Sequence, residues 1–152
     1  MKAAASRQVV LRRANQADAG GIARTMRAAL ASFDWMPVLH TPDEDLAFIA
    51  DRVLPRQIVA VAEAGENIVG FIAVKGEWIE QLYLDPAFTG GGIGSRLLAQ
   101  AVETMPVVRL YCFQANSGAR RFYERHGFQA EVFGDGSGNE EKLPDILYVR
   151  RR

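Results

Sequence analysis

Short runs of β-branched and apolar residues alternate with stretches of helical periodicity along the chain, so the pattern predicts a mixed α/β fold. Strands are expected wherever such a run is bounded by glycine, proline or polar turn residues. The expected strands are Val9–Leu11, Ile58–Ala62, Ile68–Val74, Trp78–Leu84, Val107–Phe113, Phe128–Phe133 and Ile146–Val149.

Helices are expected where apolar residues recur every three or four positions. Four helices are expected. The first begins after the capping pair Asn15 and Asp18 and reaches Phe33, and the others run from Thr41 to Leu54, through Leu97 to Met105, and from Asn116 to Gly127. The resulting order is β-α-α-β-β-β-α-β-α-β-β. The three central strands form an antiparallel meander, and the last of them is joined to the next strand by a parallel crossover through a helix.

Length and composition indicate a single domain over residues 1–152. Of the 152 residues, 49% are hydrophobic and 24% charged, as is usual for globular proteins. The 18 basic and 18 acidic residues cancel, which argues against a nucleic-acid or membrane partner. With one cysteine and no Cys/His cluster, neither a disulfide framework nor a metal site is expected. The chain shows no long apolar run and no secretory leader, so we expect a cytoplasmic protein.

The most informative segment is a glycine cluster between the Trp78–Leu84 strand and the next helix. Gly90, Gly91, Gly92 and Gly94 free the backbone to approach a ligand. The unpaired N–H groups of a helix N-terminus then suit a pyrophosphate. A flexible turn is the alternative explanation of the glycines.

Two familiar phosphate motifs do not fit the cluster, because it lacks the lysine of a P-loop and has Leu97 where a dinucleotide fingerprint needs a third glycine. The cluster resembles instead the acetyl-coenzyme A signature of the GNAT N-acetyltransferase superfamily, Gln/Arg-x-x-Gly-x-Gly/Ala after a strand. Gly92 and Gly94 stand at its two small positions. Thr89 stands where glutamine or arginine is usual, a departure that affects a side-chain contact to phosphate and leaves the backbone N–H groups in place.

A second GNAT signature follows in the matching order. Asn116, Ala119 and the run Phe122–Phe128 are similar to its Asn-x-x-Ala…Tyr-Glu-x-x-Gly-Phe pattern. Together with the preceding meander, the two signatures cover roughly the last two thirds of the chain. The ordered pair is far more specific than the glycine motif alone.

The resemblance implies a GNAT fold in which two parallel strands, Trp78–Leu84 and Val107–Phe113, splay apart around acetyl-coenzyme A as co-substrate. The pantetheine arm would pair with the strand backbone, and the glycine loop would hold the pyrophosphate. The implied coenzyme-binding residues are Leu82, Tyr83, Leu84, Thr89, Gly90, Gly91, Gly92, Ile93, Gly94, Ser95 and Asn116. The last strands of similar domains often pair in a homodimer.

Acetyl transfer to an amine requires a base, a stabilised oxyanion and a proton for the departing thiolate. Glu80 is the candidate base, because a carboxylate within an apolar strand is unexpected unless it has a charged partner or a catalytic role. Similar enzymes often carry a carboxylate at this position. Strict alternation would place Trp78, Glu80 and Leu82 on one face unless a bulge intervenes. The alternative is an exposed Glu80 paired with a surface arginine or lysine.

Tyr123 is the candidate general acid. Tyr123 shares a helix face with Asn116, and in the GNAT family the matching tyrosine points its hydroxyl at the coenzyme sulfur. The alternative is a packed core tyrosine whose hydroxyl is already hydrogen-bonded. Cys112, on a predicted buried strand, is expected to be a small core residue.

The expected function is an acetyl-coenzyme A-dependent N-acetyltransferase that acts by direct transfer in a ternary complex. Its acceptor is a primary amine on a small molecule or a peptide. Phe33, Trp35 and His40 lie in a segment that commonly walls the acceptor site of similar enzymes, with an ordinary surface loop as the alternative. The acidic stretch 139–145 suits a cationic acceptor, or is a solvated loop. The alternative function is a non-catalytic acyl-coenzyme A-binding or sensing module of the same fold.

Overall fold

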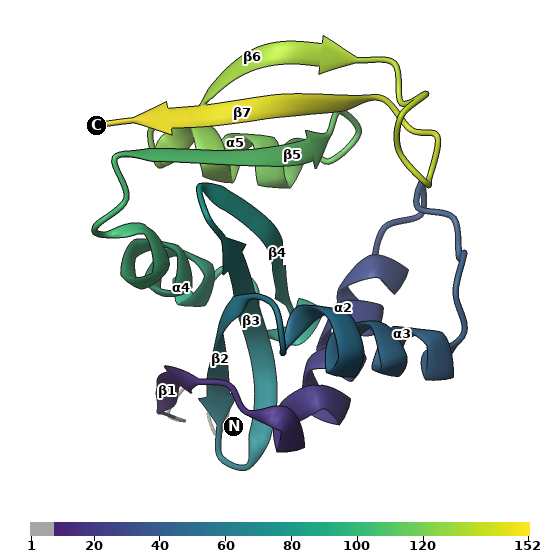
Figure 1. Cartoon of the computed structure of the whole chain (residues 1–152), viewed down its shortest axis with the longest axis vertical. Helices are drawn as coiled ribbons and strands as arrows, with labels where there is room; N and C mark the ends of the chain where they lie inside the picture. The colour runs from purple at the N-terminus through teal and green to yellow at the C-terminus, as the bar shows by residue number, and fades with distance from the viewer. Residues whose placement is uncertain (1–7) are drawn as a thin grey trace.

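The computed structural model describes residues 8–152, which form one seven-stranded sheet in the order β1-β2-β3-β4-β5-β7-β6 (Figure 1). Neighbouring strands are antiparallel except for β4 and β5, which are parallel. The strands are β1 (Val9–Arg13), β2 (Ile58–Ala64), β3 (Asn67–Lys75), β4 (Trp78–Leu84), β5 (Val107–Phe113), β6 (Gln129–Gly134) and β7 (Asp145–Arg151). The expected mixed α/β class, the meander and the parallel crossover are therefore confirmed.

Helices cover both faces of the sheet (Figure 1). Ile22 of α2 and Val53 pack with Phe71 on one face, and Leu97 of α4 packs with Ile72 on the other. The helical elements are η1 (Gln16–Asp18), α2 (Ala19–Ala31), α3 (Pro42–Phe48), η2 (Ile49–Val53), η3 (Pro86–Phe88), α4 (Ile93–Val102) and α5 (Ser117–Arg125). The two apolar cores meet the sheet from opposite sides because β3 alternates its side chains between them.

The observed helices differ from the expected ones at their ends. Phe33 lies beyond α2, and Met105 lies beyond α4, just before Pro106. The helix expected over 41–54 is α-helical only as far as Phe48 and finishes as the π turn η2. Met105 still packs against the core after the helix ends, so apolar periodicity alone extends the helix too far.

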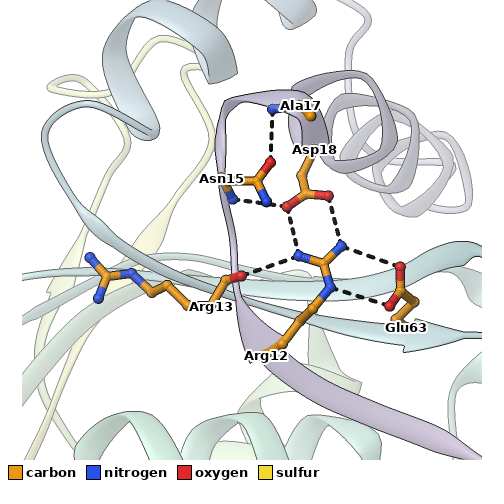
Figure 2. Close-up of polar contacts among 6 residues, drawn as sticks. All are labelled: Arg12, Arg13, Asn15, Ala17, Asp18 and Glu63. Atoms are coloured by element: carbon orange, nitrogen blue, oxygen red, sulfur yellow. Dashed lines mark hydrogen bonds and ion pairs between the residues drawn. The ribbon is translucent and has the colours of Figure 1, made fainter.

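Arg12 ties β1 to the start of the helical segment and to β2 (Figure 2). Its guanidinium donates to both carboxylate oxygens of Asp18 at 2.8 Å each and to the carboxylate of Glu63 at 3.2 Å. Asp18 also accepts from the backbone N–H of Asn15, whose side chain accepts from the N–H of Ala17. These contacts hold the pKa of Asp18 below its usual value, chiefly through the hydrogen bonds from Arg12. The expected capping pair is confirmed.

The parallel strands β4 and β5 separate almost as soon as they meet. Their ladder contains one residue pair, Trp78 with Arg109, and the Arg109 N–H donates to the Glu77 carbonyl at 2.8 Å. β5 then pairs over its full length with β7, while β4 stays paired with β3 (Figure 1). The splay implied by the resemblance is confirmed, and it leaves the backbone of β4 beyond Trp78 without a sheet partner on the β5 side.

Candidate active site

A cavity of about 650 Å³ occupies the gap between β4 and β5 and extends from the glycine loop to the segment that follows α2. Most of the residues expected at the site line it. These are Phe33, Trp35, Glu80, Leu82, Tyr83, Leu84, Thr89, Gly90, Gly92, Gly94, Ser95, Asn116 and Tyr123. Gly91, Ile93 and His40 are not among its lining residues, and the Ile93 side chain is buried in the core.

The glycine loop forms one end of the cavity. Gly90 and Gly92 have φ angles of +83° and +85°, a conformation that other residues rarely adopt. Gly92 is the N-cap of α4 and has no side chain to cap the helix, so the N–H groups of the first turn remain available to an anion. In that turn, the Ser95 hydroxyl is hydrogen-bonded to the His126 ring at 2.9 Å. The glycine loop lies after β4, has positive φ angles and leads into a helix end with free N–H groups, and these features fit a pyrophosphate cradle.

Glu80 lies at a β-bulge in β4. In the ladder with β3, Ile79 pairs with Val74 and Gln81 with Ala73, so Glu80 is the extra residue between them. The bulge interrupts the alternation, and Trp78 and Leu82 therefore do not share a face. Glu80 is exposed at the rim of the cavity, and it makes no ion pair with any described residue. The surface ion pair that was the alternative explanation of Glu80 is not found among residues 8–152.

Tyr123 of α5 lines the cavity and is only 8% exposed. Its ring packs edge-on against Phe122 and Phe128. Burial, together with Cys112 and Tyr83 nearby, raises the pKa of Tyr123 well above its usual range, so the phenol keeps its proton at neutral pH.

Asn116 caps α5. Its side-chain oxygen accepts from the Ala119 N–H at 3.1 Å, as the sequence predicts, and Asn116 also lines the cavity. One residue thus fixes the start of the helix that carries Tyr123 and stands at the wall of the cavity.

Two further weakly acidic groups line the same cavity. Burial raises the pKa of the Cys112 thiol to about 11, and burial with the nearby Glu141 raises the pKa of Tyr83 to about 12. Cys112 is buried, as expected, but its position on the cavity wall is not evident from the sequence. The alternation of buried residues along β5 places it on the core face, whereas the departure of β4 opens that face to the cavity.

The other end of the cavity is aromatic. Phe33 and Trp35 stack with ring centroids 4.9 Å apart, and Trp35 meets Phe113 edge-on at 5.8 Å. His40 is further along the same segment and contacts Glu140, which joins the segment between α2 and α3 to the loop between β6 and β7 (Figure 1). His40 therefore lies beside the acidic stretch and outside the cavity wall.

The described residues, 8–152, contain no group of three or more His, Cys, Asp or Glu side chains that could hold a metal ion. In the same part of the chain, no helix is long and apolar enough to cross a membrane.

Comparison with known proteins decides the family. Residues 55–130, which carry the meander, the glycine loop and the second signature, match the model of the GNAT acetyltransferase domain. The chain belongs to the GNAT acetyltransferase family. It is 35% identical over 94 residues to the peptidyl-lysine N-acetyltransferase YjaB of Salmonella typhimurium, a match that covers 59% of this chain and 63% of that relative. The chain thus spans a little under two thirds of that relative.

Solved structures share the fold of this GNAT domain over nearly its whole length. The PaiA N-acetyltransferase of Thermoplasma acidophilum, in complex with coenzyme A, superimposes with a TM-score of 0.76 at 20% identity and covers 95% of this chain and 99% of its own. YncA from Salmonella typhimurium, with acetyl-CoA, gives a TM-score of 0.74 at 20% identity and covers 95% and 94%. At this level of identity the likeness establishes the fold alone.

Proposed function

We propose that this protein transfers the acetyl group of acetyl-coenzyme A to a primary amine while both substrates are bound. The observation that carries the proposal is the cavity between the splayed strands, which has a glycine cradle at one end, a protonated tyrosine in its wall and a carboxylate at the rim. Family membership and the coenzyme A and acetyl-CoA present in the PaiA and YncA structures support the choice of donor.

The donor fits the exposed side of β4. Beyond Trp78, the backbone N–H and C=O groups of Leu82–Leu84 that face β5 have no strand to pair with, and unpaired backbone groups at a cavity wall need partners. The amide groups of the pantetheine arm would supply those partners, much as an added strand would. The N–H groups of the glycine loop would then hold the pyrophosphate.

The reaction needs three proton transfers, and we assign two of them to groups of the cavity. Glu80 accepts a proton from the acceptor ammonium, directly or through a water molecule, and the free amine attacks the acetyl carbonyl carbon. Attack forms the C–N bond, and the nitrogen of the tetrahedral intermediate gives up its second proton to a water molecule. The C–S bond then breaks, and Tyr123 donates its proton to the departing thiolate. Because the pKa of Tyr123 is raised, its hydroxyl is protonated when the thiolate forms, and the tyrosinate left after the transfer takes up a proton again.

The acceptor we propose is the side chain of a lysine in a polypeptide. Two relatives, YjaB from Salmonella typhimurium and YjaB from Escherichia coli at 32% identity, are named peptidyl-lysine N-acetyltransferases. The aromatic wall of Phe33, Trp35 and Phe113 suits the apolar stem of lysine. Glu141 is close enough to Tyr83 to raise the pKa of the phenol, and it therefore places near the cavity a negative charge that suits the ammonium group.

The direct test is turnover with a lysine-containing peptide whose N-terminus is blocked. The purified protein with acetyl-coenzyme A and this peptide is expected to release free coenzyme A thiol and to add one acetyl group to the lysine, as read by mass spectrometry. Binding of acetyl-coenzyme A without release of thiol, with peptide and small amines alike, would instead support the non-catalytic binding module. An unchanged acceptor KM in the double variant Glu140→Gln, Glu141→Gln would exclude a role for the acidic loop.

A further inference from the structure

The glycine loop offers backbone N–H groups to a phosphate but no cationic side chain. Thr89, which stands where the family signature has glutamine or arginine, donates its hydroxyl to the Pro86 carbonyl at 3.1 Å and so is engaged within its own turn. The end of α4 supplies about half a unit of positive charge, whereas a pyrophosphate carries about two negative charges. A further positive group is therefore expected near the loop.

Arg125 is the candidate for the positive group near the glycine loop. Among the described residues that line the cavity, Arg125 is the only lysine or arginine. Its guanidinium lies over the Phe122 ring, 6.0 Å from the centroid, and the same ring packs against Gly94 of the loop, where a Cβ atom would lie 3.5 Å from it. No carboxylate within residues 8–152 forms an ion pair with Arg125. The guanidinium is thus held on the loop side of the cavity and is available to an anion.

The structure assigns to Arg125 the side-chain contact to the coenzyme pyrophosphate that Thr89 does not make. This inference rests on the proposed use of acetyl-coenzyme A. A guanidinium presents two parallel N–H donors that match two phosphate oxygens, so the side-chain donor that glutamine or arginine supplies from the loop in the signature comes here from the last turn of α5. Arg125 binds and positions the donor, and it takes no part in proton transfer.

Calorimetric titration of Arg125→Gln with acetyl-coenzyme A tests the assignment. The variant is expected to bind about tenfold more weakly than the unmodified protein, since a charge-assisted contact is lost. The same loss is expected with acetyl-dephospho-coenzyme A, which keeps the pyrophosphate, and no loss is expected with acetyl-pantetheine, which lacks it. Arg121→Gln, one turn earlier on the same helix and outside the cavity wall, is the matched control and should bind like the unmodified protein.

Three results would overturn the assignment. The first is unchanged affinity of Arg125→Gln for acetyl-coenzyme A. The second is a loss seen with acetyl-coenzyme A and absent with acetyl-dephospho-coenzyme A, because it would place the guanidinium on the 3′-phosphate. The third is an equal loss in Arg121→Gln, which would indicate a general charge effect. Failure of the unmodified protein to bind any of the three ligands would instead contradict the proposed function itself. Equal thermal midpoints for both variants would show that the comparison is made between folded proteins.

Discussion

Three residues that line the cavity have raised side-chain pKa values, and this bears on acetyl transfer. Tyr83, Cys112 and Tyr123 all have raised pKa values, because burial penalises their anions. A thiolate that leaves in this cavity therefore meets neutral O–H and S–H donors and no competing anion. Glu80, the one carboxylate among the described residues that line the cavity, is exposed at the rim, where the acceptor amine would enter.

Tyr123→Phe removes one hydroxyl from this set. We expect kcat to fall about a hundredfold while the Kd for acetyl-coenzyme A stays nearly unchanged, since general acid catalysis is worth this much and the ring still fills the cavity. Because the pKa of Tyr123 is raised, the donor stays protonated through alkaline pH, and kcat of the unmodified protein should not fall from tyrosine ionisation below about pH 10. The readout is thiol release across pH, with Tyr148→Phe as control, because the Tyr148 hydroxyl donates to Glu124 and Tyr148 is not among the residues that line the cavity. A kcat of Tyr123→Phe equal to that of the unmodified protein would contradict the role of Tyr123 as general acid.

Glu80→Gln tests the base. An amide cannot take the ammonium proton, so kcat with a lysine peptide is expected to fall by about a hundredfold, again with little change in acetyl-coenzyme A affinity. Glu77→Gln is the matched control, since Glu77 immediately precedes β4 and faces Arg109 at 3.9 Å. Equal rates for both variants and the unmodified protein would show that another group, or bulk water, accepts the proton.

Among the elements, the turn η1 is held to the sheet by the contacts between Arg12 and Asp18. We expect Asp18→Asn to lower the free energy of unfolding by about 2 kcal/mol near neutral pH, because a charge-assisted pair and half of a capping box are lost together. The folded-state pKa of Asp18 is depressed, so its stabilisation is complete above the unfolded value near 3.8 and is lost as pH falls through the lower folded value.

Urea unfolding of the unmodified protein and Asp18→Asn over a range of pH checks this prediction. The difference in the free energy of unfolding between the unmodified protein and Asp18→Asn should decrease below about pH 3.8 and be constant above it. Glu63→Gln, which loses only the longer contacts to Arg12, should have a smaller effect. A difference that does not change with pH would mean that the charge of Asp18 contributes nothing.

Most elements could be predicted from the sequence, because apolar periodicity and capping residues are local signals. The capping of η1 and α5 by Asn15 and Asn116 is of this kind. The bulge at Glu80 is not, because alternation along a strand does not show where the ladder takes up an extra residue. The contact between His40 and Glu140 and the place of Cys112 on the cavity wall each depend on a neighbour far away in the chain. The separation of β4 from β5 was implied by the GNAT resemblance and not by any pattern of residues.

In the whole molecule, the two halves of the sheet meet through one ladder pair between β4 and β5 (Figure 1). A ligand seated in the gap contacts both halves and α4 and α5 as well. Acetyl-coenzyme A at a hundred times its Kd adds about 2.7 kcal/mol to the stability of the folded state. For a chain of this length, we expect a rise of roughly 5–10 °C in the thermal midpoint.

Differential scanning fluorimetry measures this rise, with NAD as the control because it shares the adenosine and pyrophosphate groups but has no pantetheine arm. The expected result is a concentration-dependent shift with acetyl-coenzyme A and little shift with NAD. Equal shifts for the two ligands would place the binding energy in the nucleotide and contradict the use of the β4 backbone.

The central claim is that the gap between β4 and β5 binds acetyl-coenzyme A, and titration calorimetry tests it most directly. The purified protein should bind acetyl-coenzyme A with a Kd in the micromolar range, on the order of 1–100 μM, and should give no comparable heat with NAD or ATP. Absence of binding at millimolar acetyl-coenzyme A would contradict the claim and leave a GNAT fold whose cradle does not hold the family's co-substrate.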